Sequence, residues 1–236
     1  MAETDLFKWR HYESEIILLC VRWYLRYALS YRDLEEMMEE RNLTVDHTTI
    51  YRWVQRYASE LEKRCRPHLR PTNDTYRVDE TYVKIKGQWY YLYRAVDSTG
   101  QTIDFMLSAK RDTKAAKRFF RKMLKAPKHQ SPRVINVDQN KAYPPAVEEL
   151  KKEGVLPVTS QLRQCKYLNN IVEQDHRFIK RRVNPGLGFF SFDTARRTIG
   201  GYEVTNMIRK GQVEGIGKGD IRGQVGFVAN LFKVAA

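Results

Sequence analysis

The stretch YRVDETYVKIKGQWYYLYRAVDSTG, residues 76–100, decides the fold. Apolar and polar residues alternate on both sides of Lys86-Gly87, a dipeptide that marks a turn between two strands. Ser98-Thr99-Gly100 marks a second turn, and the alternation resumes from Thr102 to Leu107. The pattern therefore predicts an antiparallel meander of three strands.

Downstream of the meander, helix and strand patterns alternate. A basic helix is predicted over Thr113–Lys125, a short apolar strand (VINV) over 134–137 and a helix over about Pro145–Lys152. A weakly defined strand then precedes a helix from about Asn170 to Arg182. The order β-β-β-α-β-α-β-α predicts an RNase H-like mixed sheet covered by helices, in the α+β or α/β class.

Upstream of residue 65 the sequence predicts three helices. Ser30 and Asp33 form an N-terminal capping pair for the second helix, and Asp46 is suited to cap the third, His47–Arg64. A short polar connection between these two helices is the layout of a helix-turn-helix, whose last helix enters the major groove. A three-helix bundle without DNA contacts has the same pattern. The candidate base-reading residues lie early on the third helix, away from its apolar stripe: His47, Thr48, Thr49 and Arg52.

The composition favours a polyanionic partner. Lys and Arg number 42 against 28 Asp and Glu, a formal net charge of +14, and residues 1–70 hold 12 of each sign. The excess therefore lies after residue 70, where it would displace counterions from phosphates. Three cysteines without a CxxC pair argue against a disulfide framework or a zinc finger. With no signal-peptide pattern and no apolar run that could span a bilayer, we expect a cytoplasmic, nucleoid-associated protein and no membrane partner.

Three carboxylates lie on elements that the predicted topology brings together. Asp79 is in the first strand, Asp138 directly follows VINV, and Glu173 is on the last predicted helix. The first and fourth strands of an RNase H-like sheet are neighbours, so their carboxylates can meet. Carboxylates at one point repel unless cations neutralise them, and hard oxygen ligands suit Mg²⁺ or Mn²⁺. Two such ions would promote an in-line displacement at phosphorus.

Other acidic residues near these three are interpreted as bystanders. Glu80 faces away from Asp79 in a regular strand, and Asp97 precedes a turn that it serves. Asp175 is two positions after Glu173 and therefore lies on a different face of the same helix. His176 is given no role.

Basic residues follow Glu173 on the same helix. Arg177 is four positions on and Lys180 seven, so both share its face, and Arg181 and Arg182 add to the charge. Such cations would hold the DNA backbone beside the metals. The alternative is a solvated basic helix end that complements the helix dipole.

At these residues the sequence resembles the transposases of insertion-sequence family six, which carry an Asp-Asp-Glu triad. The 34 residues between Asp138 and Glu173 match the spacing of that family, and Lys180 occupies its basic position seven residues after the glutamate. The resemblance covers nearly the whole chain and is weakest at the C-terminal end. It is carried by VRWYLRYALSYRDLEEMMEERN, VDHTTIYRWVQRYA, VDETYVKIKGQWYYLYRAVDSTG, NVDQNKAYP and KYLNNIVEQDHRFIKRR.

The resemblance implies a DNA transposase that binds the terminal inverted repeats of its element, exposes 3′-hydroxyls and joins them to target DNA. Asp79, Asp138 and Glu173 would be both catalytic residues and ligands of two Mg²⁺ or Mn²⁺ ions. The expected partner is double-stranded DNA, and synapsis of two ends implies a homodimer or larger assembly. Exchange of phosphodiesters needs no nucleotide cofactor, consistent with the lack of a GxxxxGK[ST] loop.

The expected domain organisation follows from these elements. A helix-turn-helix domain covers residues 1–66 and a linker bracketed by Pro67 and Pro71 covers 67–74. The RNase H-like catalytic domain covers 75–210. A tail over 211–236 holds six of the 13 glycines of the chain and is given no role.

Three alternative functions remain open at this point. A regulator derived from a transposase would bind DNA without cutting it. An RNase H-type nuclease would hydrolyse without joining strands. A basic nucleoid protein would carry out no chemistry at all.

Overall fold

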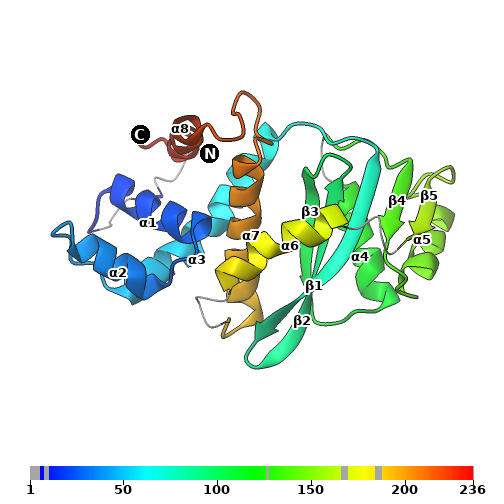
Figure 1. Cartoon of the computed structure of the whole chain (residues 1–236), viewed down its shortest axis with the longest axis horizontal. Coiled ribbons are helices and arrows are strands. Elements are labelled where there is room, and N and C mark those ends of the chain that lie inside the picture. The colour runs from blue at the N-terminus through cyan, green and yellow to red at the C-terminus, as the bar shows by residue number, and fades with distance from the viewer. Residues whose placement is uncertain (1–5, 8–10, 126–127, 166–169, 184–187, 236) are drawn as a thin grey trace. The chain divides into compact units, whose positions relative to one another are not determined.

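The computed structural model describes residues 6–7, 11–125, 128–165, 170–183 and 188–235 (Figure 1). Its contacts define two compact units. The first holds the described residues within 1–68, 181–187 and 192–236, and the second holds those within 69–180 and 188–191. Within the described ranges, no helix is both long and apolar enough to cross a membrane.

The second unit is built on a five-stranded sheet with the order β3-β2-β1-β4-β5. The first three strands are antiparallel neighbours, whereas β4 runs parallel to β1 and β5 parallel to β4. This is the RNase H-like arrangement, and both the predicted meander and the predicted contact of the first and fourth strands are confirmed. The strands are β1 Thr75–Ile85, β2 Gln88–Asp97, β3 Thr102–Ser108, β4 Val134–Val137 and β5 Gln161–Gln164.

Helices cover both faces of this sheet (Figure 1). On one face, α4 (Thr113–Leu124) and α5 (Tyr143–Lys152) enclose a core in which Phe119 and Phe120 pack with buried residues of β1, β2 and β4. On the opposite face lies α6 (Asn170–Val183), whose His176 contacts Asp79 and Arg94. The two sets of helices therefore approach β1 from opposite sides.

The first unit is helical. Ser30 and Asp33 form the predicted capping box of α2, and the Asp46 side chain accepts a hydrogen bond from the backbone N–H of Thr48 to cap α3. Both caps satisfy backbone N–H groups that have no partner inside the helix. The helical elements are α1 Ser14–Arg26, α2 Tyr31–Glu39, α3 His47–Cys65, the 3₁₀ turn η1 Arg66–His68, α7 Phe192–Arg209 and α8 Ile221–Phe232.

Helices α7 and α8 were not predicted from the sequence. Helix α7 packs against α1 and α3, and an added Cβ at its Gly201 would lie 2.7 Å from Leu25 Cδ2 and 2.8 Å from Ala58 Cβ. Nearly all of its second half is buried, polar residues included. Although residues 192–209 were expected within the catalytic domain, they pack with the N-terminal helices.

The expected linker over 67–74 divides between the two units. Residues from 69 onward belong to the sheet unit, where Thr72 is buried and its hydroxyl lies 2.8 Å from Nδ1 of His129. Asn73 hydrogen-bonds through its side chain to the Ser98 hydroxyl. This segment therefore packs on the sheet unit.

Candidate active site

Asp79 and Asp138 meet at the middle of the sheet. Arg77 of β1 pairs with Asn136 of β4 in parallel register, so two residues further on Asp79 comes opposite Asp138. Asp79, Glu80 and Asp138 each have a carboxylate oxygen within 4.8 Å of those of the other two. We refer to these three residues as the carboxylate cluster.

Glu80 is the member of the cluster that the sequence pattern indicated to be a bystander. Its side chain is 2% exposed and accepts hydrogen bonds from the Tyr143 hydroxyl at 2.5 Å and from Asn140 Nδ2 at 3.1 Å. Burial raises the pKa of Glu80, and the hydrogen bond from Tyr143 opposes that shift. Glu80 does turn toward α5, as strand alternation predicted, yet its carboxylate still reaches the edge of the site.

Arg111 links two carboxylates of the cluster. Its Nε lies 2.8 Å from Glu80 Oε1, and its Nη2 lies 2.9 Å from Asp138 Oδ2. Partial burial opposes the charge of Arg111, but the hydrogen bond to Glu80 and the charges of both carboxylates outweigh it and raise the pKa of Arg111. The other oxygen of Asp138 accepts the backbone N–H of Asn140 at 3.0 Å. The Asp138 carboxylate is therefore held in place by the backbone of Asn140 on one oxygen and by the Arg111 guanidinium on the other.

Asp79 is contacted from the α6 side. Its Oδ2 lies 3.2 Å from Nε2 of His176, whose Nδ1 lies 3.3 Å from the Nη1 atom of Arg94. Arg94 is fully buried on β2, and its Nη2 donates to Asp175 Oδ2 at 2.6 Å. Asp175, interpreted from the sequence as a bystander, therefore fixes Arg94. His176, which was given no role, is the direct contact of Asp79.

Glu173 lies outside the carboxylate cluster. It is in the first turn of α6 and is exposed, three residues before His176. Positions three apart share one face of a helix, so α6 carries Glu173 on the side of the sheet where His176 meets Asp79. Of the three residues predicted to hold metal, the structure brings Asp79 and Asp138 together and leaves Glu173 on the neighbouring helix.

The basic residues of α6 divide into two groups. Arg177, Lys180 and Arg181 are exposed. Arg182 is buried and donates hydrogen bonds to the backbone carbonyls of Leu25 and Arg26. Burial lowers the pKa of Arg182 to about 10. The expectation that Arg182 adds to a DNA-facing charge is therefore wrong, because its side chain holds α1.

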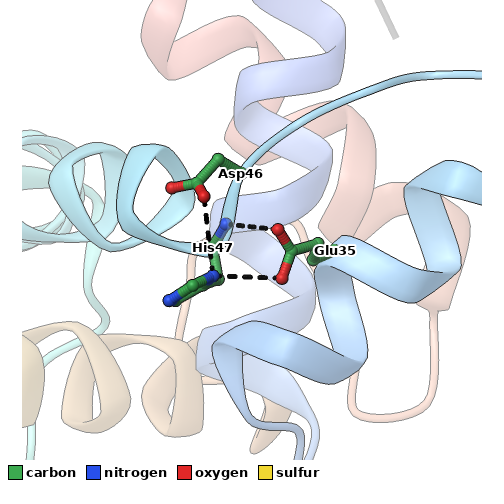
Figure 2. A group of neighbouring side chains, drawn as sticks. All are labelled: Glu35, Asp46 and His47. Atoms are coloured by element: carbon green, nitrogen blue, oxygen red, sulfur yellow. Dashed lines mark hydrogen bonds and ion pairs between the residues drawn. The ribbon is translucent and has the colours of Figure 1, made fainter.

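The predicted base-reading residues begin at the N-terminus of α3. Figure 2 shows that His47 faces Glu35 of α2, which accepts hydrogen bonds from the His47 backbone N–H at 3.2 Å and pairs with its Nδ1 at 3.0 Å. His47 thus links the two helices of the helix-turn-helix layout. Thr48 and Arg52 are exposed and Thr49 is half-buried.

Comparison with known proteins identifies the family. A family model described as a DDE domain, of the IS240 type of transposase, matches residues 73–212. The chain belongs to this transposase family. It is 39% identical, over 87% of its length and 89% of theirs, to the Staphylococcus aureus transposases of the insertion sequence-like element IS431mec (strain Mu50) and of IS257 in transposon Tn4003.

Two solved integrase structures are also similar to the chain. The HTLV-2 integrase catalytic core with magnesium is 19% identical over 48% of this chain and 71% of that one, with a TM-score of 0.39. The BIV integrase core is 14% identical over 66% of this chain and 98% of that one, with a TM-score of 0.43.

Membership of this transposase family fixes the general activity. The chain is a DNA transposase, an enzyme that depends on divalent metal to cut DNA and transfer strands. Asp79 and Asp138 both lie within the matched DDE domain, as does Glu173. The alternative of a regulator without catalysis is not favoured.

Proposed function

We propose that this transposase binds the terminal inverted repeats of its own element, cuts a phosphodiester at each end to free a 3′-hydroxyl, and joins that hydroxyl to target DNA. The observation that carries the proposal is the meeting of Asp79 and Asp138 on neighbouring parallel strands, with α6 against the same site. A regulator or a nucleoid protein would not need carboxylates gathered in this way.

The donor set fits a hard divalent cation. Three carboxylates within 4.8 Å of one another repel, and Arg111 relieves only part of that repulsion through Glu80 and Asp138. Oxygen donors of this kind suit Mg²⁺ or Mn²⁺. We propose that Asp79, Asp138 and Glu173 hold two such ions, which when bound acidify the attacking water or hydroxyl and stabilise the leaving oxygen.

The residues around the cluster orient its carboxylates. The backbone N–H of Asn140 fixes one oxygen of Asp138, and His176 fixes one oxygen of Asp79. Glu80 holds Arg111 beside Asp138 and is proposed as a positioning residue, not a metal ligand, because its side chain is 2% exposed and turned toward Tyr143 of α5.

DNA contacts are proposed on both units. On α6, the exposed Arg177, Lys180 and Arg181 would hold the backbone flanking the cut. On α3, His47, Thr48, Thr49 and Arg52 would read the terminal repeat, with His47 also linking α3 to α2. We propose residues 1–66, 75–210 and 211–236, with a linker over 67–74, as functional divisions, while the compact units differ from them because residues 192–209 pack with the N-terminal helices. A homodimer or larger assembly in the cytoplasm, on the nucleoid, would synapse two ends.

The decisive test uses the full chain and DNA carrying the inverted repeats that flank its gene. Cleavage and joining are followed on denaturing gels with Mg²⁺, with Mn²⁺ and with neither, and Asp79→Asn is the control. We expect metal-dependent nicking, followed by joining of a precut 3′-hydroxyl end. Binding without cutting would support the regulator, and cutting without joining would support an RNase H-type nuclease.

A further inference from the structure

The β1–β2 hairpin presents an ordered row of side chains. Lys86 and Gly87 both have positive φ, 49° and 78°, which is the backbone of a two-residue type I′ turn. Such a turn fixes the register of the strands, and Tyr82 therefore pairs with Tyr91, and Lys84 with Trp89. Because side chains alternate along a strand, these four lie on one face of the hairpin.

This face continues from Glu80 of the carboxylate cluster, whereas Asp79 lies on the opposite face of β1. Glu80 precedes Tyr82 on the same face, and its partner Tyr93 is buried against Phe119 of α4. Beyond this pair the helical cover thins: Tyr91 still packs partly buried against the core, whereas Tyr82 is 53% exposed and Trp89 is 61% exposed. Two strand residues span roughly 7 Å, about two steps of stacked nucleotides. The exposed face thus begins within one or two nucleotides of the cluster.

The aromatic rings on this face contact one another. The ring centroid of Tyr82 lies 6.1 Å from that of Trp89 and 5.4 Å from that of Tyr91. The Lys84 ammonium lies 5.7 Å from the centre of the Trp89 ring. Cross-strand pairing stabilises a hairpin and accounts for the contact of Tyr82 with Tyr91. It does not account for a tryptophan that leaves most of its surface in water on the hairpin that extends from the carboxylate cluster.

We propose that Tyr82, Tyr91 and Trp89, with Lys84, form a stacking platform for unpaired DNA bases next to the cleaved or joined phosphodiester. The platform offers flat apolar rings and cations, from Lys84 on the face itself and from Arg111 at its inner end, which match the base and the phosphate of a nucleotide. A base inside a duplex has both faces covered by its neighbours. The platform therefore selects bases that leave the helix, and an opened end would bring its terminal phosphodiester to Asp79 and Asp138.

The platform rests on the proposed function, since it assumes that DNA reaches the carboxylate cluster. It differs from the contacts proposed for α3 and α6, which are with duplex bases and phosphates. Loss of the platform should therefore weaken binding of single strands and spare binding of duplexes.

The test measures fluorescence anisotropy of labelled oligothymidylate, about 12 nucleotides long, and of a duplex of the same length, with the full chain. Tyr82→Leu and Trp89→Leu keep apolar bulk but lose the flat ring, whereas Tyr82→Phe and Trp89→Phe keep it. We expect each Leu variant to bind the single strand about tenfold more weakly, with duplex affinity changed less than about twofold. The Phe variants should stay close to the unsubstituted chain, and thermal melting checks that all four are folded.

Equal losses on single strand and duplex, or no loss on either, would overturn the platform. A change in sedimentation of the Leu variants without any change in DNA binding would instead identify this face as a protein contact and would also overturn it. Metal-dependent nicking of a supercoiled plasmid that carries the inverted repeats flanking the gene separates the two proposals. A chain that nicks normally while the Leu variants bind single strands as tightly as before refutes the platform alone, and a chain that never nicks refutes the proposed function.

Discussion

Nε2 of His176 lies 3.2 Å from Oδ2 of Asp79, and the contact made by the other ring nitrogen, Nδ1, determines which nitrogen carries the proton. Arg94 Nη1 lies 3.3 Å from Nδ1 of the same ring. A guanidinium can only donate, so Nδ1 accepts and the proton sits on Nε2, which donates to Asp79. Asp175 holds the buried Arg94 at 2.6 Å. The chain Asp175–Arg94–His176 therefore fixes the orientation of a carboxylate proposed to bind metal.

These contacts of His176 predict that two substitutions of this residue have different effects on cleavage. His176→Ala removes the donor and should lower the cleavage rate about 10- to 100-fold, the range seen when outer partners of metal ligands are lost. His176→Gln can still present an N–H to Asp79 and should recover most of that loss. Single-turnover cleavage measured over a series of Mn²⁺ concentrations checks both, because weaker metal binding moves the half-saturating concentration. Equal rates in Ala, Gln and unsubstituted chains would show that His176 only packs.

Substitutions of the carboxylates should fall into two classes, those of proposed metal ligands and that of the positioning residue Glu80. Asp138→Asn and Glu173→Gln remove proposed metal ligands and should each lower cleavage by at least about 1,000-fold, with DNA binding retained. Glu80→Gln removes only the anchor of Arg111 and should cost about tenfold or less. Cleavage gels and duplex-binding assays on the same samples separate the classes. A Glu80→Gln variant as inactive as Asp138→Asn would make Glu80 a ligand and would weaken the assignment of Glu173.

Local patterns explain what the sequence predicted well. The Lys86-Gly87 turn, the Ser30 capping box and the VINV strand each depend on residues close together in the chain, and all three are present. The neighbouring positions of β1 and β4 followed from the order of the elements.

The features that the sequence did not predict depend on contacts between residues far apart in the chain. Helix α7 is buried on nearly all sides, so it has no apolar stripe with a helical period. The roles of Glu80 and His176 depend on partners distant in sequence, Tyr143 and Arg94 respectively. The sequence also does not show which acids neutralise the basic helix α4: its Lys117 pairs with Glu149 of α5 and with Glu153, which follows α5.

End recognition should depend on Arg52 more than on other cations of α3. Arg52→Ala is expected to weaken binding of the terminal repeat about tenfold while changing affinity for unrelated duplex much less, because a base-edge contact carries sequence information. Arg56→Ala, on the same helix and also exposed, is the matched control and should alter both affinities to a similar, small extent. Competition binding with repeat and random DNA measures the ratio. Equal weakening of both DNAs by Arg52→Ala would refute its assignment as a base reader.

The cysteines should differ in reactivity. Burial raises the pKa of Cys20 to about 11 and that of Cys65 to about 12, whereas Cys165 is half-exposed. Iodoacetamide near neutral pH should therefore modify Cys165 in the folded chain and the other two only after unfolding. A thiol whose folded pKa is raised contributes stability below its unfolded pKa of 9.0, and that contribution is lost as pH rises toward 11. Mass spectrometry of labelled peptides checks the order, and early modification of Cys20 would contradict the packing of α1.

Helix α7 provides the sharpest test of the packing in the helical unit. At Gly201 an added Cβ would lie 2.7 Å from Leu25 Cδ2 and 2.8 Å from Ala58 Cβ, well inside normal contact, so α1 or α3 must shift. Gly201→Ala should therefore lower the free energy of unfolding by about 1–3 kcal/mol. At Gly226 of α8 no atom of the described residues lies within 4 Å of an added Cβ, so Gly226→Ala should be neutral or stabilise by up to about 1 kcal/mol through helix propensity. Urea unfolding of both variants measures the difference. If Gly201→Ala were as stable as Gly226→Ala, α7 would not approach α1 and α3 this closely, and the grouping of residues 192–209 with the N-terminal helices would fail.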